Sequence, residues 1–499
     1  MTTKVGKLLS AVGTTRSSHC DGPLAGSWLW FLFAAALLPR LILVVIYFNY
    51  PIALDDMYQY DMLARSLASG HGYRWYAAAD VEQLRPYLSR FIDMSTLTFP
   101  SEGLLTTFRA PGYPVLLAGL YLLVPWTSRF GFARLVQVVL SALLAPLVAV
   151  LAGKLRMGRK EAPGAGLVLA FYPIMLFYPL GLASEDLFIP LLLIAILSIL
   201  KAAQSTARWP SLLAGGVLGL AVLTRSILAP FVMLAALWLW RWGKARQRGA
   251  LMLLLGALCL CLPWAIRNTI IMKHPTFVET SLGYNLFVGY HPQGNGGFIH
   301  EVAVIPLSIL DDAERDRWCI QSAIDYIRAN PKEALLRVAR RAAYFMGVEE
   351  RELSYFYGAG FWGHVPQPWL ILIYLALTTP WVFVVVFSIW GLHESPYPPA
   401  VWLIVALAIG YALPHLFVLA EPRFHLALVP ILSPFAMWGW ARRRGMINVL
   451  TVLGKSRSDM AALVALGISL ALWVWGFAMN WSKLVALMGP DGHRLYLPY

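Results

Sequence analysis

Long apolar segments alternate with short polar ones along nearly the whole chain. Windows of about 20 apolar residues, the length that crosses a bilayer as a helix, predict about eleven membrane spans. Their approximate limits are 28–48, 132–153, 163–181, 187–204, 210–225, 226–241, 249–270, 367–390, 400–419, 425–441 and 459–479. The pattern therefore predicts an all-α polytopic membrane protein.

Basic residues fall in short clusters between these spans, at 4–16, 154–160, 201–208, 241–248 and 442–457. All of the clusters lie on one side of the membrane if the N-terminus is cytoplasmic, which is the orientation that Lys and Arg in short loops favour. The sequence therefore predicts a multi-pass protein of the cytoplasmic membrane with its C-terminus on the outer, periplasmic side.

This topology leaves two large outer loops, 49–131 and 271–366. In the first loop, the apolar stretch from Gly112 to Val124 is short for a span, and we expect it to lie along the membrane–water interface. The second loop mixes turn residues with a charged segment, Asp311 to Arg341, that is expected to be helical. The predicted organisation is an N-terminus at 1–27, a transmembrane half at 28–270, the outer region 271–366, C-terminal helices at 367–480 and an outer tail at 481–499.

Composition agrees with a membrane location. Of 499 residues, 59% are hydrophobic and only 13% are charged, whereas about a quarter of a soluble protein is charged. The net charge of +14 arises from the clusters that set orientation, so it does not indicate nucleic acid. The four cysteines show no spacing typical of a metal site or a disulfide framework.

Charged residues at the ends of separate spans gather on the predicted outer face: Asp55, Asp56, Glu185, Asp186, Arg225, Arg267 and Arg423. A charge at the membrane is costly unless it has a partner or a function, so their convergence predicts one outward-facing site. Arginine matches the geometry of phosphate. Carboxylates can deprotonate a hydroxyl group or stabilise positive charge developing on a sugar. A lipid phosphate that carries a sugar would need both.

Structural roles are the alternative for each of these residues. Asp55 and Asp56 also suit the start of a short helix running to Gly70, because Asp is a favoured cap. The three arginines also suit contact with lipid headgroups, reached by extended side chains.

Other polar residues are expected to be structural. Asp61 and Arg65 are four residues apart and are expected to pair on a helix surface. Arg40, inside the first span, is expected to find partners within the bundle. His291 and His300 are expected to be solvated loop histidines.

Seven strings of the chain resemble, in order, those of the membrane-embedded GT-C glycosyltransferases that use polyprenyl-phosphate sugars, the class of protein O-mannosyltransferases and the lipid A aminoarabinose transferase. The match spans roughly residues 28–440. The strings lie at 55–73, beginning Asp-Asp-Met-Tyr, and at 108–114, 184–188, 223–225, 263–268, 283–289 and 421–424.

The resemblance implies a GT-C-type bundle and assigns roles to matching residues. Asp55 would be the catalytic acid–base carboxylate, with Asp56 in place of the usual Glu beside it. The second-loop acid maps to Glu185 or Asp186, and both assignments stay open. The donor-phosphate ligands would be Arg225, Arg267 and Arg423, and the residues that position donor and acceptor would be Tyr58, Arg109, Tyr284 and Asn285.

The expected activity is transfer of a sugar from a polyprenyl-phosphate carrier to a hydroxyl group of a glycan, lipid or protein, with inversion, on the outer face of the membrane. The sequence contains no Gly-rich phosphate-binding loop, so nothing in it indicates a nucleotide. The aminoarabinose transferase places a metal-ligating Glu just before its interface helix, where this chain reads Phe108 to Pro111 without a carboxylate. A divalent metal is thus possible but has no support in the sequence.

The alternative from another class is a proton- or ion-coupled transporter or flippase of lipid-linked sugars. It predicts charges near the middle of the bilayer and inverted repeats, whereas this chain places its acids at span ends and shows no repeat. The identities of the sugar and of the acceptor stay open.

Overall fold

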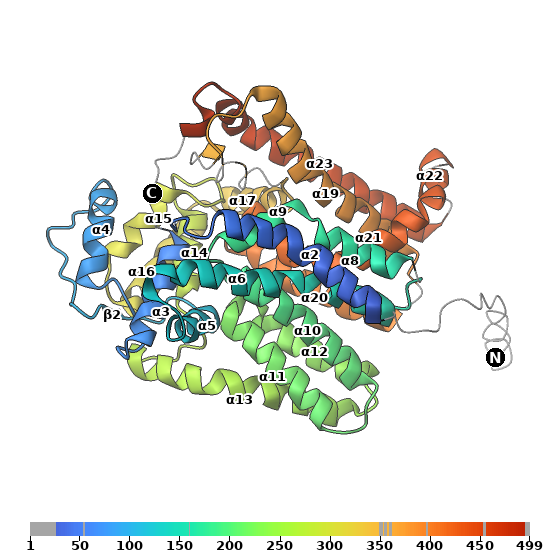
Figure 1. Ribbon diagram of the computed structural model, residues 1–499, viewed down its shortest axis with the longest axis horizontal. Coiled ribbons are helices and arrows are strands. Elements are labelled where there is room, and N and C mark those ends of the chain that lie inside the picture. The colour runs from blue at the N-terminus through green and yellow to red at the C-terminus, as the bar shows by residue number, and fades with distance from the viewer. Residues whose placement is uncertain are drawn as a thin grey trace.

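The computed structural model describes residues 26–52, 55–158, 160–348, 353, 357–358, 362–395, 398–452 and 456–494. Within these residues the regular structure is helical, apart from one antiparallel pair of two-residue strands, β1 (Arg74–Trp75) and β2 (Leu104–Leu105). The prediction of an all-α polytopic membrane protein is confirmed (Figure 1).

All eleven predicted spans correspond to helices, but they differ in length. Seven helical segments of the described chain are long and apolar enough to cross a membrane. They are α2 (Gly26–Ile46), η1 (Trp126–Ser128) with α6 (Arg129–Ala142) and α7 (Leu144–Lys154), α10 (Glu185–Ala203), α13 (Arg246–Met272), α19 (Gln367–His393), α20 (Pro398–Phe417) and α23 (Arg457–Leu487).

The remaining spans are bent or short. Helix α8 (Glu161–Ala170) continues into α9 (Pro173–Phe177) and η2 (Tyr178–Leu180) with a bend of 53°, and together they form a possible eighth crossing. Helices α11 (Trp209–Thr224), α12 (Ala229–Trp242) and α21 (Val429–Ala441) are shorter apolar helices.

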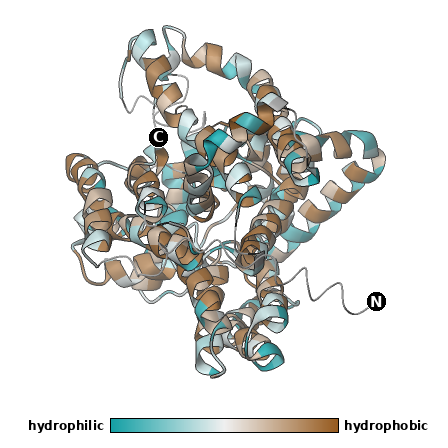
Figure 2. Ribbon diagram, turned by 90° about the vertical axis from the view of Figure 1, so that its right-hand side faces the viewer, coloured by the Kyte–Doolittle hydropathy of each residue, from teal (hydrophilic) through white to brown (hydrophobic). Residues whose placement is uncertain are grey.

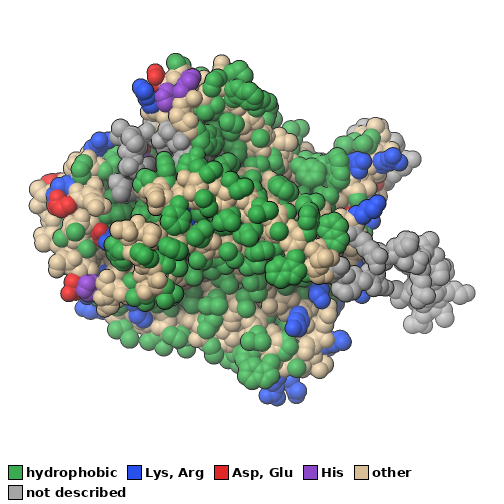
Figure 3. Space-filling model, viewed as in Figure 1, with side chains coloured by type: hydrophobic (Ala, Val, Ile, Leu, Met, Phe, Trp, Pro, Cys, Tyr) green, Lys and Arg blue, Asp and Glu red, His purple; other side chains and the backbone are tan. Residues whose placement is uncertain are grey.

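Most of the long helices run side by side between two ends of the molecule (Figure 1). The helices of the two predicted outer loops gather at one end, on the left of Figure 1, and helix α22 (Arg443–Val452) lies at the other. Hydrophobic side chains cover the middle of the face shown in Figure 3, while Lys and Arg cluster at the end near α22. Hydrophobic residues dominate the helices, and hydrophilic residues concentrate in the turns (Figure 2).

The first predicted outer loop folds into three short helices, α3 (Asp56–Ala68), α4 (Ala78–Leu88) and α5 (Gly112–Tyr121), around the small sheet. The apolar stretch assigned to the interface thus forms a ten-residue helix, too short to cross a bilayer, which needs about 20 residues.

The second predicted outer loop contains α14 (Ser281–Tyr290), α15 (His300–Val304), α16 (Asp312–Ala329) and α17 (Pro331–Phe345). The charged segment is helical as predicted, but it is divided into α16 and α17 because Pro331 disfavours helical backbone at Asn330. The two loops pack together, since Asp312 Oδ2 accepts hydrogen bonds from Thr106 Oγ1 and Thr107 N, both at 2.6 Å.

Arg40 has its partners inside the bundle, as predicted. This fully buried side chain donates hydrogen bonds to the carbonyl oxygens of Leu169 (2.9 Å), Ala170 (2.8 Å) and Met175 (3.1 Å). These carbonyls flank the bend between α8 and α9, where the end of a helix leaves acceptors unpaired. Arg40 therefore holds the bent span against α2.

Glycines bring α11 and α13 into close contact. A Cβ atom on Gly215 would collide with the backbone at Leu253, and one on Gly256 would collide with the backbone at Leu212. Small residues allow such close approach between membrane helices. The tight pair fixes the end of α11, where Arg225 follows.

Candidate functional site

The start of α3 places two adjacent carboxylates in different environments. Asp55 is the N-cap residue, and its Oδ1 accepts a hydrogen bond from Met57 N at 3.0 Å. Asp56 is the first helical residue and forms ion pairs with Arg109 and, at 3.4 Å, with Arg423. The alternative that Asp55 caps a short helix is confirmed, and Asp56 instead links two arginines from distant parts of the chain.

Arg109 lies between α3 and the start of α5. Besides Asp56, its Nε and one terminal nitrogen donate to Gln59 Oε1 at 2.9 and 2.6 Å. Gln59 is three residues after Asp56, so both face Arg109 from one side of α3. Burial works to lower the pKa of Arg109, but Asp56, Tyr60 and other neighbours outweigh burial and raise it. The guanidinium therefore stays charged.

Arg423 comes from η6 (Pro422–Ala427), between α20 and α21. Its Nε donates to Glu421 Oε2 at 2.7 Å, and its second partner is Asp56. Burial again works to lower the pKa of Arg423, and the carboxylates of Glu421 and Asp56 raise it well above its ordinary value. Asp56 thus joins the first loop to a segment that lies 367 residues later in the chain.

A second ion pair lies beside the first. Glu185, in the first turn of α10, contacts Arg225 at 2.5 Å. Tyr60 on α3 donates a hydrogen bond to Ser184 Oγ at 3.2 Å, and Arg225 lies 3.5 Å from the same oxygen. Tyr60 therefore connects the Glu185 pair with the helix that carries Asp56. Five of the predicted site residues meet in this network, which we call the arginine–carboxylate cluster: Asp56, Arg109, Glu185, Arg225 and Arg423.

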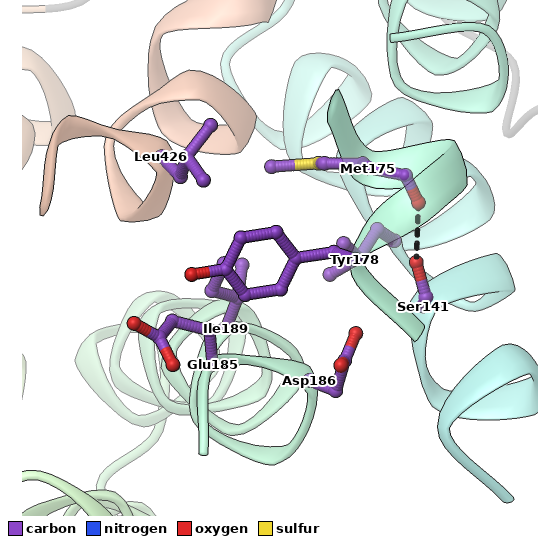
Figure 4. A pocket seen from close by; sticks show the side chains of 8 residues that line it. Ser141, Met175, Tyr178, Glu185, Asp186, Ile189 and Leu426 are labelled. Atoms are coloured by element: carbon purple, nitrogen blue, oxygen red, sulfur yellow. Dashed lines mark hydrogen bonds between the residues drawn. The ribbon is translucent and has the colours of Figure 1, made fainter. Parts of the chain in front are cut away.

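Asp186 faces away from this cluster. Figure 4 shows Glu185 and Asp186 pointing to different sides of α10, with Asp186 directed to the side of Ser141 and the Tyr178 hydroxyl on the side of Glu185. Asp186 is 5% exposed, and its Oδ2 has no hydrogen-bond partner among the described residues. Of the two candidates for the second-loop acid, Glu185 pairs with Arg225, and Asp186 lies on another side of α10.

Arg267 lies outside the cluster. Its guanidinium donates to the carbonyl oxygens of Thr106 at 2.8 Å and Tyr73 at 3.4 Å, and it stacks on Trp264 with 4.7 Å to the ring centre. Because the Tyr73 hydroxyl donates to Arg109 O at 2.9 Å, Arg267 and the cluster share a neighbour without direct contact. Arg267 fixes the first loop to the end of α13.

The three remaining predicted residues lie in different surroundings. Tyr284 on α14 packs edge-on against Phe108 with 5.2 Å between ring centres, next to Arg109. Tyr58 points to another side of α3, with its hydroxyl 3.1 Å from Asp80 Oδ1 and 2.7 Å from Gln83 Oε1. Asn285 is a half-buried residue of α14.

Glu279 is a site neighbour that sequence reasoning missed. Its Oε2 accepts a hydrogen bond from Ala110 N at 3.0 Å, and its other oxygen accepts one from Ser226. It therefore lies against the start of α5 and against the residue after Arg225. No local pattern marks this position, because Glu279 lies in a connecting segment and its contacts are far away in sequence.

Two expectations about structural residues were wrong. Asp61 and Arg65 do pair, at 2.8 Å, but not on a surface, because Asp61 is 1% exposed and also contacts Arg129 at 3.0 Å and Tyr121. His300 is not a solvated loop residue. It begins α15, packs on Tyr87 with 5.2 Å between ring centres, and has a buried Nε2 with no hydrogen-bond partner among the described residues.

Metal ligands do not converge in the described part of the chain, where no group of three His, Cys, Asp or Glu side chains could hold an ion. We therefore assign no step to a metal.

No model of a protein family matches the chain, and no curated protein matches it. Among solved structures, the chain is similar to the crystal structure of ArnT from Cupriavidus metallidurans bound to undecaprenyl phosphate, with 13% sequence identity and a TM-score of 0.38. The similarity covers 92% of this chain and 89% of that chain. At this level it carries no argument about activity.

Proposed function

We propose that the protein is an integral membrane glycosyltransferase that moves a sugar from a polyprenyl-phosphate carrier to an acceptor hydroxyl group on the outer face of the cytoplasmic membrane. The observation that carries the proposal is the arginine–carboxylate cluster. Its three arginines come from the first loop, the end of α11 and η6, and converge on Asp56 and Glu185 at the ends of membrane helices.

The arginines suit a phosphate that enters from the membrane. The side chains of Arg225 and Arg423 are 19% and 23% exposed, so they are buried enough to be desolvated and open enough to meet a ligand. Guanidinium groups bind phosphate oxygens through paired donors. A donor phosphate would bind Arg225 and Arg423 beside the carboxylates that now contact them. Arg267 is bound to backbone carbonyls, and we assign it to positioning the first loop.

The two adjacent aspartates suit different tasks. Protonation of Asp56 would cost its ion pairs with both Arg109 and Arg423, so we assign Asp56 to holding the arginines in place. Asp55 caps α3 by accepting a hydrogen bond from Met57 N, its charge acts on His300, and it corresponds to the first-loop acid–base carboxylate of the enzymes that the chain resembles. We assign it as the general base. We assign Glu185, not Asp186, as the second-loop acid, because it pairs with Arg225.

The reaction follows from these assignments. Asp55 accepts the proton of the acceptor hydroxyl as its oxygen attacks the anomeric carbon. The bond between that carbon and the phosphate oxygen breaks, and polyprenyl phosphate leaves with the electron pair, stabilised by Arg225 and Arg423. A single in-line displacement inverts the anomeric configuration. Because phosphate is already a good leaving group, positioning and charge stabilisation dominate catalysis.

The proposal is tested with the full chain in liposomes, a panel of polyprenyl-phosphate sugars and a crude envelope extract as acceptor. Release of free polyprenyl phosphate is followed by mass spectrometry. Wild-type protein should release it from at least one donor, and Asp55→Asn should reduce the rate at least about 100-fold, within the range for loss of a general base. Asp93→Asn, at an exposed aspartate of the same loop, is the matched control and should retain the wild-type rate.

Two results would contradict the proposal. A near-normal rate in folded Asp55→Asn would remove the assigned base. Movement of donor between leaflets without release of polyprenyl phosphate would favour the transporter alternative.

A further inference from the structure

A second concave site lies at the far end of α3, away from the arginine–carboxylate cluster. Its pocket encloses about 430 Å³ including its open mouth. Residues from the end of α3, the small sheet, α4 and the start of the span Trp126–Lys154 line it. The lining residues that matter here are Arg65, Arg74, Trp75, Asp80, Glu102 and Trp126.

The charges of this lining are balanced, with two arginines, Arg65 and Arg74, against the carboxylates of Asp80 and Glu102. Arg65 is already paired with Asp80 at 2.6 Å, and Arg74 donates to the carbonyl oxygen of Gly103 at 2.9 Å. A phosphate site would present an excess of positive donors. A lining that offers both donors and acceptors instead suits hydroxyl groups, because each hydroxyl donates one hydrogen bond and accepts others.

An exposed tryptophan gives the pocket a feature of a ligand site. Trp126 is 48% exposed, although Arg129 lies 4.9 Å from its ring centre, so a broad part of the indole is open to a ligand. Trp75, which also lines the pocket, is 1% exposed and forms a closed part of its wall.

We infer that this pocket binds a neutral, hydroxyl-rich sugar ring of the acceptor, which rests on Trp126 and donates to and accepts from the balanced polar lining. The assignment to the acceptor rests on the proposed function. Helix α3 joins the pocket to the assigned base, because Asp55 and Met62 of the lining are seven residues apart and share one face of the helix. Arg65 lies about 15 Å along the helix axis from Asp55 at 1.5 Å per residue, which exceeds one sugar ring. The acceptor would therefore be an oligosaccharide whose reacting end lies at Asp55 and whose distal ring lies in the pocket.

Binding is tested without donor, on the full chain in lipid nanodiscs free of sugar detergents. The probes are methyl glucoside, methyl mannoside and methyl galactoside, with inorganic phosphate as the alternative ligand, observed by saturation-transfer NMR. At least one methyl hexoside should receive saturation from the wild type. Trp126→Ala should weaken its binding about tenfold, because an aromatic contact is lost. Trp209→Ala, at another exposed tryptophan (69% exposed), is the matched control and should bind as the wild type does.

A second variant distinguishes loss of binding from misfolding. Glu102→Ala removes an exposed acceptor of the lining and should weaken binding in a protein that melts as the wild type does. No saturation of any methyl hexoside, binding of phosphate alone, or unchanged binding in both folded variants would overturn the inference. This assay needs no turnover, so its result does not depend on the transfer assay. If transfer is normal and no hexoside binds, the inference about this pocket is wrong and the proposed function still stands.

Discussion

Two sets of arginines in this molecule, one buried and one partly exposed, make different contacts. The first set, the carbonyl-bound arginines, consists of Arg40, Arg134 and Arg341, which are 0%, 1% and 0% exposed. The second set, the carboxylate-bound arginines, consists of Arg109, Arg225 and Arg423, whose side chains are 20%, 19% and 23% exposed. The first set donates mainly to backbone carbonyls, and the second pairs with acids at the ends of membrane helices.

This difference in contacts indicates that arginine side chains serve two functions in this protein. A carbonyl-bound arginine satisfies acceptors that the backbone leaves unpaired, as Arg134 does for Leu180 O at 2.7 Å and Arg341 for Gly289 O at 2.6 Å. Such contacts cannot be given up without exposing those carbonyls to an apolar interior. A carboxylate-bound arginine can exchange its acid for another anion, provided that a path for the ligand exists. Partial exposure provides that path only in the second set.

The largest expected effect is on stability and comes from the carbonyl-bound set. Arg40→Leu would remove the donor to the carbonyl oxygens of Leu169 and Ala170 and would leave Met175 O only Ser141 Oγ, at 3.4 Å, as a donor among the described contacts. It should lower the free energy of unfolding by about 3–5 kcal/mol. Unfolding by sodium dodecyl sulfate, followed by tryptophan fluorescence, measures this. Arg241→Leu, at an exposed arginine, should change stability by less than about 0.5 kcal/mol. Equal stability of the two variants would remove the structural role assigned to Arg40.

The second-largest expected effect is on catalysis, and it distinguishes the carboxylate-bound arginines from the carbonyl-bound arginines. Arg423→Gln should lower the rate of polyprenyl-phosphate release about 100- to 1,000-fold, the range for loss of one preorganised charge or donor at a reacting centre, with a smaller loss of stability than Arg40→Leu. Arg423→Lys should restore part of the rate, because it keeps the charge without the paired donors. Arg341→Gln should show the opposite pattern, with the larger loss in folding.

The same two assays can contradict this division of the arginines. If Arg341→Gln folds normally and loses turnover, or if Arg423→Gln fails to fold, then contact type does not divide structural from catalytic arginines in this protein.

Sequence reasoning identified the elements of the fold better than their contacts. Every predicted span is helical, because apolar content over about 20 residues is a local property. The bend between α8 and α9 was not predicted, although Pro173 begins α9 and disfavours helical backbone at Tyr172. Its fixation by Arg40 could not be predicted, because Arg40 and Met175 are 135 residues apart.

The candidate site shows the same limit. Span ends identified Asp56, Glu185, Arg225 and Arg423 as charged residues that need partners, and these residues meet. Nothing local distinguished Glu185 from its neighbour Asp186, because the direction of each side chain depends on how α10 is packed. Glu279 was missed for the same reason.

The smallest expected effect is the pH dependence of stability, which probes the surroundings of Asp55. Burial lowers the pKa of His300 from 6.5, while Glu301 and Asp55 oppose this shift. The native state therefore binds fewer protons than the unfolded chain below about pH 6.5, so stability should fall as the pH decreases through this range. Asp55→Asn removes an opposing charge and should steepen the fall in melting temperature between pH 7 and pH 5.5 by on the order of 1 °C. His300→Gln in the Asp55→Asn background should abolish the steepening. A steeper fall that persists in the double variant would place its origin elsewhere and would remove His300 from the neighbourhood of the proposed base.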